Sequence, residues 1–306
     1  MQVCIITDDT AQNGGWHGAK LAAAFIDRGI VVNFVALQDC LIDLSAEKSI
    51  IQIPGLNELP KAVFVRGIAG GSFQQITTRL NILHGLKMLG VAVYNDGKSI
   101  ERAVDKAMTS FLLHHAGVGT PKTWVCESRH LAHMIIKNQC NDIHNKTYAH
   151  DKKDTNENHS LVIKPLFGSQ GVGVRIIDDV MPLPRDQFVE GVYYLQQFIA
   201  AKHDYRVFII DNKVIAAMRR TGEGWLHNVA KGAICEFIED ADVCEIALRA
   251  ALVLDISYCG VDIIRDINGQ LLVLEVNSIP AWRGLQSVTD IDIAQTLVDD
   301  FLSKIN

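Results

Sequence analysis

The segment "VDIIRDINGQLLVLEVNSIP", residues 261 to 280, constrains the fold more than any other part of the chain. Two strongly apolar runs flank an Asn-Gly dipeptide at residues 268 to 269, which is the strongest two-residue signal for a β-hairpin turn. If that dipeptide forms the turn, pairing outward from it places Asp262 opposite Glu275. Asn277 falls on the same face, because alternate residues of a strand point the same way. The sequence therefore predicts an antiparallel sheet that carries two carboxylates and an amide together.

This group of side chains is typical of a divalent-cation site. Directly opposed side chains have Cβ atoms about 5 Å apart, so the carboxylates of Asp262 and Glu275 repel one another unless a cation lies between them. Carboxylate and amide oxygens suit Mg²⁺ that is shared with nucleotide phosphates. The alternative is a solvent-facing pair of acids, which the apolar residues around them disfavour. We therefore expect Asp262, Glu275 and Asn277 to bind Mg²⁺.

A second hairpin is predicted from "VIKPLFGSQGVGVRII", residues 162 to 177. Lys164 precedes the glycines and Pro165 follows it, which does not fit the P-loop pattern, where the lysine comes after the last glycine. The dinucleotide-binding pattern requires a helix after the glycines, whereas "VGVRII" alternates and predicts a strand. The glycines then lie at the tip of a strand-loop-strand, where their amides could cover a triphosphate as a lid. Taken alone, the stretch favours an ordinary glycine-rich hairpin with a surface lysine, so the lid depends on what the rest of the chain contains.

The order of elements predicts three parts. Residues 1–98 alternate strand, helix and strand, which indicates a small parallel α/β domain. Residues 99–195 contain a long helical pattern and the glycine hairpin, and residues 196–306 contain two further hairpins, a helix and a closing amphipathic helix. The long helical pattern, "SIERAVDKAMTSFLLHHAG", has Ser99 as its predicted N-cap and ends at Gly117.

The segment 138–160 is polar and almost free of aliphatic residues, so we expect a surface insertion loop after a short amphipathic helix. Its histidines match no metal-ligand spacing. Seven cysteines without a Cys-x-x-Cys pair indicate neither a disulfide framework nor a zinc site.

The bulk composition excludes several classes of protein. No apolar run approaches the length of a membrane span, and the N-terminus has no basic region or cleavage site, so we expect a cytoplasmic protein with no membrane partner. With 29 basic and 35 acidic residues the net charge is -6, which argues against general nucleic-acid binding.

A chain-long series of motifs then resembles a known family. The series "FVRGIAG", "DKAM", "VIKPLFGSQGVGV", "LQQFI", "DYRVFII", "AAMRR", "GVDII" and "LEVNSIP" is similar to the ATP-grasp superfamily, and most closely to its RimK-like branch of ATP-dependent glutamate ligases. The resemblance implies an α/β (α+β) ATP-grasp fold, in which an N-terminal parallel domain precedes two antiparallel-sheet subdomains that clamp ATP. It also implies a C–N ligase that activates a carboxylate as an acyl phosphate, lets an amine attack it, and releases ADP and phosphate.

The resemblance assigns residues to ATP and to its metal. Lys106 and Lys164 match phosphate contacts, and Asp262, Glu275 and Asn277 match the Mg²⁺ ligands, where Mn²⁺ is expected to substitute. The remaining ATP positions are the lid residues Gly168, Ser169, Gln170 and Gly171, the hinge residues Gln196, Gln197 and Phe198, and the ribose-side Asp204. Gln197 departs from the branch, where glutamate is common; backbone groups read adenine at such a hinge, so we still expect binding.

Catalysis needs cations, because the carboxylate and ATP are both anionic. Arg206 and Arg220, on the two arms of one hairpin, are assigned to the acyl phosphate and its adduct, with Asn228 nearby. Arg219 is expected on the opposite face of its strand. The alternative is that these arginines form ordinary salt bridges.

The acceptor is predicted from "SIPAWRGLQ". Trp282 and Arg283 could stack on and pair with a ring-bearing acidic acceptor, as expected for relatives that glutamylate one-carbon carriers of the tetrahydromethanopterin or methanofuran type. Alternatively, Trp282 packs against the C-terminal helix. Arg66 could hold a substrate carboxylate, and Trp16 and His17 lie in the first strand-to-helix loop, a usual place for substrate contacts.

Three other functions stay open at this point: glutamylation of a ribosomal-protein C-terminus, phosphotransfer to a group other than a carboxylate, and nucleotide binding without catalysis. The negative charge favours small-molecule substrates over the ribosome. The relatives suggest a homo-oligomer, either a dimer or a tetramer.

Overall fold

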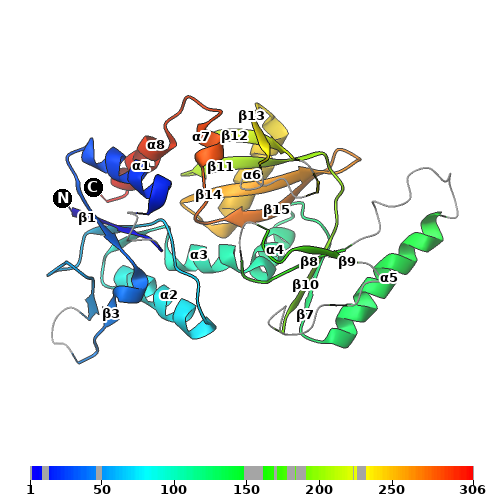
Figure 1. The fold of residues 1–306 in the computed structure, drawn as a ribbon, viewed down its shortest axis with the longest axis horizontal. Coiled ribbons are helices and arrows are strands. Elements are labelled where there is room, and N and C mark those ends of the chain that lie inside the picture. The colour runs from blue at the N-terminus through cyan, green and yellow to red at the C-terminus, as the bar shows by residue number, and fades with distance from the viewer. Residues whose placement is uncertain are drawn as a thin grey trace.

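The computed structural model describes residues 2–8, 14–45, 50–147, 161–168, 171–177, 183, 191–222, 224–225 and 232–305, with backbone alone for 140–147. The described residues form a small two-stranded sheet and three larger sheets. The larger ones follow one another along the chain: a parallel sheet, a four-stranded antiparallel sheet, called the central sheet because it is second in the sequence, and a five-stranded antiparallel sheet. Figure 1 shows the parallel sheet at one end of the molecule, the helix α5 at the other end, and the strands β14 and β15 between them. Among the described residues, no helix has the length and apolarity needed to cross a membrane.

The first sheet has the strand order β2-β1-β5-β6, and its pairs are parallel. Its elements are β1 (Gln2–Ile6), α1 (Gly15–Ile26), β2 (Val31–Val35), β5 (Ala62–Val65), α2 (Phe73–Met88) and β6 (Ala92–Tyr94). Alternate residues of β1 and β5 enter two different apolar clusters, one with α1 and one with α2. The predicted alternation of strands and helices is confirmed. The strands could be recognised in the sequence because parallel strands that are covered on both faces consist of continuous apolar runs. Three short elements that the sequence did not predict complete this part: η1 (Leu37–Asp39), β3 (Leu41–Ile42) and β4 (Ile51–Gln52).

The long helix predicted after the first sheet is two helices, α3 (Gly97–Val104) and α4 (Lys106–His115). The predicted N-cap at Ser99 is wrong: Asp96 caps α3 by accepting from the Ser99 amide at 3.0 Å. Asp105 interrupts the helix because its carboxylate accepts from the amides of Ala107 and Met108, at 2.8 and 3.0 Å, and so caps α4. The break places Lys106 in the first turn of α4.

The central sheet has the strand order β7-β10-β8-β9. Its elements are β7 (Thr123–Cys126), α5 (Arg129–Thr147), β8 (Leu161–Lys164), β9 (Arg175–Ile177) and β10 (Tyr193–Gln197). The strands β8 and β9 pair antiparallel, as predicted for the glycine hairpin. The predicted loop over 138–160 is wrong for its first part, because α5 continues to Thr147. Polar residues continue a helix readily when one face of its earlier turns packs, here through Ala132 and Ile136.

The five-stranded sheet has the order β13-β12-β11-β14-β15. Its elements are β11 (His203–Ile210), β12 (Lys213–Thr221), β13 (Ile234–Phe237), α6 (Ala241–Leu254), β14 (Tyr258–Arg265) and β15 (Leu271–Asn277). One face packs on α6 through residues such as Val207 and Val261. The other face carries Phe208 and Tyr258 into the same cluster as α1 and β5. The first sheet therefore covers part of the face of the five-stranded sheet that lies opposite α6.

The turn between β14 and β15 differs from the predicted two-residue turn. Asp266 pairs with Gln270 through a backbone hydrogen bond of 2.9 Å, and its carboxylate accepts from the amides of Asn268 and Gln270, so the loop has three residues. Gly269 there has φ +85°, a conformation that glycine adopts without strain. The pairing near the turn is consequently shifted by one residue from the prediction.

A β-bulge between Asp262 and Ile263 removes the shift, and the predicted pair of Asp262 with Glu275 is confirmed.

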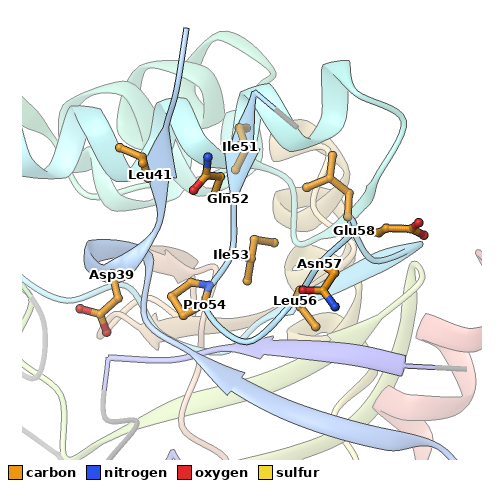
Figure 2. Close-up of a pocket in the computed structure, with 10 residues that line it drawn as sticks. Asp39, Leu41, Ile51, Gln52, Ile53, Pro54, Leu56, Asn57 and Glu58 are labelled. Atoms are coloured by element: carbon orange, nitrogen blue, oxygen red, sulfur yellow. The ribbon is translucent and has the colours of Figure 1, made fainter. Parts of the chain in front are cut away.

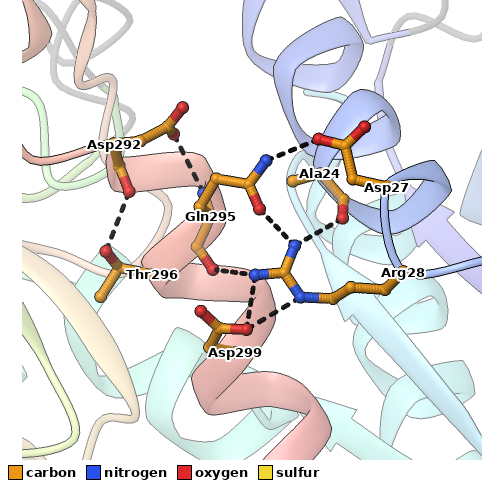
Figure 3. A network of polar contacts seen from close by, with 7 residues as sticks. All are labelled: Ala24, Asp27, Arg28, Asp292, Gln295, Thr296 and Asp299. Carbon is orange, nitrogen blue, oxygen red and sulfur yellow. Dashed lines mark hydrogen bonds and ion pairs between the residues drawn. The ribbon is translucent and has the colours of Figure 1, made fainter.

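The C-terminal part of the chain packs on its N-terminal part. The short helix α7 (Arg283–Gln286) leads to α8 (Ile293–Ser303), which packs on α1. Arg28 joins the two helices: it donates to Asp299 Oδ1 through Nε at 2.8 Å and also to Gln295 Oε1, as Figure 3 shows. Gln295 in turn donates to Asp27 at 2.8 Å. The closing amphipathic helix is thus confirmed, and it covers the first domain.

Candidate active site

The carboxylates of the last hairpin lie on the face of the five-stranded sheet that is opposite α6. Asp262 pairs with Glu275 and Gly260 pairs with Asn277, and these residues alternate with the apolar residues that pack on α6. Asn277 Nδ2 donates to Glu275 Oε1 at 3.0 Å. The amide nitrogen is therefore turned toward Glu275, which leaves the amide oxygen of Asn277 for a cation.

Two arginines on β11 and β12 lie on the same face. Arg206 donates to both oxygens of Asp262, through Nη2 at 2.9 Å and through Nε at a shorter distance. Arg220 donates to both oxygens of Asp204, at 2.6 and 2.9 Å, and its Nη2 lies 3.1 Å from Asp262 Oδ1. The side chains of Asp204, Arg220 and Asp262 are all at most 10% exposed.

The charges within this group shift one another's pKa. Burial alone would raise the pKa of Asp262, but Arg206 and Arg220 outweigh it and lower this pKa to about 2. Burial lowers the pKa of Arg220, and the carboxylates of Asp262 and Asp204 reverse this and raise it. Both partners are therefore charged across the physiological pH range.

Asp204 was predicted at the ribose. In the structure its two oxygens accept from Arg220, so this carboxylate orients an arginine. Arg219, as predicted, lies on the other face, where it forms a half-exposed ion pair with Glu236 at 2.8 Å.

Lys164 ends the strand β8 of the central sheet and faces the carboxylates of the five-stranded sheet. Burial lowers its pKa most, the carboxylates of Glu275 and Asp262 raise it and the neighbouring Lys106 lowers it; together these effects bring the pKa to about 8. Lys164 Nζ donates to Gln196 Oε1 at 2.6 Å. The buried Gln196 amide then donates to Thr123 Oγ1 and to the Tyr194 hydroxyl, both at 3.1 Å. This network fixes the position of the Lys164 ammonium.

Lys106 approaches the same carboxylates from the N-terminus of α4. Burial lowers its pKa, and Glu275 and Asp105 oppose the effect. Its Nζ donates to the carbonyl oxygens of Leu166 and Gly168, at 3.2 and 2.9 Å, at the start of the glycine loop. Lys106 thus holds the loop beside the site.

The other residues predicted at ATP are only partly placed. The Gln197 amide donates to the Lys122 carbonyl at 2.8 Å, and the Phe198 ring lies 5.9 Å from that of Trp225. Gly171 has φ +71°. Three predicted residues lie outside the described part of the chain: Ser169, Gln170 and Asn228.

Of the two places that the sequence left open for Trp282, the structure has the one in which the side chain packs inside the protein. Trp282 is 1% exposed and packs in one cluster with α1 and α8, which was the alternative reading. Its amide donates to His17 Nε2 at 3.1 Å, and Arg66 lies over its ring at 5.1 Å. Arg283 is exposed and lies over the ring of Trp16 at 5.8 Å. The apolar segment that follows β15 packs on the protein's own first helix, a contact that sequence spacing does not reveal.

Asn95 is a residue of the site region that the sequence analysis missed. It is fully buried just after β6, and its Nδ2 donates to the carbonyls of Tyr258 and Ser278, both at 2.7 Å. Its Oδ1 accepts from the amides of Ser257 and Tyr258. One side chain therefore ties the start of β14 to the end of β15. A polar residue directly after a strand of a parallel sheet was the signal that could have revealed it.

A hollow of about 420 Å³ lies elsewhere, beside β3 and β4 (Figure 2). It is lined by Asp39, Leu41, Ile51, Gln52, Ile53, Pro54, Leu56, Asn57, Glu58 and Leu59. None of the predicted site residues lines this hollow. The candidate site lies instead where the two antiparallel sheets converge.

The donor set fits Mg²⁺. Among the described residues no three His, Cys, Asp or Glu side chains form a metal-binding group. Two opposed carboxylates and one amide oxygen are nevertheless hard ligands, which Mg²⁺ accepts together with phosphate oxygens and water. The residues that would hold the ion are Asp262, Glu275 and Asn277.

Comparison with known proteins agrees with this geometry. A family model described as a RimK-like ATP-grasp domain matches residues 103–301. The chain belongs to the RimK-like ATP-grasp family. This membership confirms the predicted branch, the predicted fold and the predicted class of ATP-dependent ligase that forms amide bonds.

Two curated relatives of this family member are instructive. The tetrahydromethanopterin:alpha-L-glutamate ligase of Methanococcus maripaludis is 33% identical over 256 residues, 79% of each chain. The probable alpha-L-glutamate ligase of Vibrio atlanticus is 30% identical over 301 residues, 94% of this chain and 91% of that protein.

Among solved structures, the D-cycloserine synthetase DcsG has a TM-score of 0.72 at 16% identity, with both chains fully covered. The ATP-grasp ligase PsnB with minimal precursor, Mg and ADP has a TM-score of 0.66 at 20% identity, covering 99% of this chain and 98% of that one. Both establish the shared fold.

Proposed function

We propose that the protein is an ATP-dependent ligase that adds L-glutamate to the carboxylate of a small acceptor, and that this acceptor is a tetrahydromethanopterin-type one-carbon carrier. The observation that carries the proposal is the meeting of Asp262 and Glu275 with Arg206 and Arg220 on one sheet face, opposite Lys164. The 33% identity to tetrahydromethanopterin:alpha-L-glutamate ligases over 79% of the chain supports the choice of amino acid and acceptor.

Each group has a defined task in this proposal. ATP with Mg²⁺, for which Mn²⁺ would substitute, supplies the phosphoryl group and offsets its charge. Asp262, Glu275 and Asn277 hold the cation. Lys164 and Lys106 face the phosphates, and Lys106 also holds the glycine loop over them.

The two arginines act on the acceptor side. Both are held in fixed orientation by bidentate contacts with carboxylates, so they need little reorganisation to stabilise the charge that develops at the acceptor carboxylate. Water must be excluded there, because an acyl phosphate hydrolyses. The half-buried position of Arg206 and the full burial of Arg220 suit that requirement.

The test is an ADP-release assay with Mg²⁺, ATP, L-glutamate and candidate acceptors that include reduced pterins and furan cofactors, with mass spectrometry of the products. We expect a product heavier by one glutamyl unit with a reduced pterin, and no ADP release above background from Glu275→Ala. ADP release with phosphate transfer but no amide would favour a phosphotransferase. Glutamylation of a ribosomal-protein peptide in place of the pterin would contradict the acceptor. Light scattering will test the proposed homo-oligomer, and cell fractionation the proposed cytoplasmic location.

A further inference from the structure

Two buried hydrogen-bond donors lie together where the first sheet meets the five-stranded sheet. Arg66 Nε and Trp282 Nε1 are both inaccessible to solvent, and neither finds an acceptor in the part of the chain that the structure describes. The guanidinium lies 5.1 Å from the centre of the indole ring. Buried donors without a partner cost free energy and are rare, so a pair of them indicates a missing acceptor.

The surroundings favour an anion. His17 accepts the Trp282 amide through Nε2, which makes the ring neutral and leaves its proton on Nδ1. Burial, Arg66 and Arg283 lower the pKa of His17 to about 3, so the ring adds no positive charge. Burial also lowers the pKa of Arg66, and Tyr258 and the exposed carboxylate of Asp8 oppose that effect. An acceptor with negative charge would match this set of donors.

The place of these donors relates them to the reaction. Phe208 lies two residues beyond Arg206 on β11 and on the same face, and the Trp282 ring packs on it at 6.1 Å. Two residues of a strand span about 7 Å. Gly260 allows Arg206 and Pro280 to lie close to the backbone of β14, because a Cβ at this position would lie 2.8 Å from Arg206 Nη1 and 2.9 Å from Pro280. The donors thus lie on the same side of the five-stranded sheet as Arg206, with Phe208 between Trp282 and that arginine.

We propose that Arg66 and Trp282 Nε1 form a subsite for a carboxylate of the incoming glutamate, with His17 as the residue that fixes the indole. The inference rests on the proposed function and adds to it the group that selects an acidic amino acid. Trp282 then acts as a hydrogen-bond donor and as a support for Arg66.

The first test compares Arg66→Gln with the wild type in steady-state kinetics. A charge-assisted hydrogen bond to a carboxylate is lost, so KM for L-glutamate should rise by roughly 30-fold or more while KM for ATP stays within about twofold. The matched control is Arg219→Gln, which removes the same charge from the other face of the five-stranded sheet. An unchanged KM for glutamate in Arg66→Gln overturns the subsite and leaves the ligase function intact.

Amide analogues identify the carboxylate. The wild type should discriminate against L-glutamine or L-isoglutamine, whichever lacks the bound carboxylate, and Arg66→Gln should lose that discrimination. Trp282→Phe keeps a ring and removes the N–H, so its KM for glutamate should rise roughly 3- to 10-fold. Equal discrimination in the wild type and Arg66→Gln contradicts the proposal.

A binding measurement separates the subsite from the function. L-glutamate should raise the Tm of the wild-type protein without nucleotide, and it should not raise the Tm of Arg66→Gln. That result together with no glutamylated product would keep the subsite and reject the proposed acceptor or reaction. Equal Tm shifts in both proteins would reject the subsite.

Discussion

The buried pair of Arg220 and Asp204 should make a large contribution to stability. Arg220→Met removes the cation and keeps an unbranched side chain, so the Asp204 carboxylate, 10% exposed, loses both hydrogen bonds. Removing one partner of a buried ion pair costs about 3–5 kcal/mol. Asp262 keeps its contact with Arg206, so Asp204 alone loses its bidentate arginine and we expect the lower end, about 3 kcal/mol. For a chain of this size that is a fall in Tm of roughly 6 °C.

Thermal unfolding followed by circular dichroism at pH 7, without nucleotide, measures this difference. Arg219→Met is the control, because its partner Glu236 is half exposed and such pairs contribute about 0–1 kcal/mol. Asp204→Asn combined with Arg220→Met also removes the carboxylate charge that had lost its arginine and should recover at least half of the lost Tm. The reasoning is refuted if Arg220→Met falls no further than Arg219→Met, or if the double variant is as unstable as the sum of the two single variants.

Three further predictions concern the site. The Lys164 ammonium, with a pKa lowered to about 8, is lost as pH rises through that value, so KM for ATP should rise between about pH 8 and 9.5; a flat profile, or the same profile in Lys164→Met, would contradict this. Glu275→Gln should raise the Mg²⁺ concentration needed for half-maximal ADP release more than roughly 10-fold, and an unchanged requirement would remove Glu275 from the metal site. Asn95→Ala deletes four buried hydrogen bonds and should lower the free energy of unfolding by about 2–5 kcal/mol in urea titration, whereas a loss below about 1 kcal/mol would show that water replaces them.

The pair of Asp262 and Glu275 shows what hairpin reasoning can and cannot reach. Alternation identified the face correctly, because one face of each strand must pack on α6. The turn was wrong, because the Asp266 side chain caps the loop, and the bulge before Ile263 restored the pairing. No residue type marks the position of a bulge in a sequence. The correct pair was therefore predicted only because the one-residue shift at the turn and the one-residue shift at the bulge cancel.

The features that the sequence analysis did not predict depend on contacts that local sequence patterns do not show. The break before Lys106 depends on Asp105 capping a new helix, and helical periodicity alone continues across it. For Trp282 the sequence left open both stacking on an acceptor and packing against the C-terminal helix, because no local pattern relates it to His17, 265 positions away. Local sequence patterns therefore identified the helices and strands and the charged face of the sheet. Which side chains are buried where two sheets meet could be found only from the three-dimensional structure.

The contacts of Asn95 have a consequence for motion. Asn95 binds Tyr258 and Ser278, the Tyr258 hydroxyl donates to the Val65 carbonyl at 2.5 Å, and Arg28 binds Asp299. All of these join the first sheet and its helices to the five-stranded sheet or to the C-terminal helix. The first sheet and the five-stranded sheet should then move as one rigid unit, and opening should involve the sheet β7-β10-β8-β9 with its glycine hairpin. Two fluorophores, one on the first sheet and one on the five-stranded sheet, would keep their separation on nucleotide binding. A pair with one fluorophore on the sheet β7-β10-β8-β9 would not.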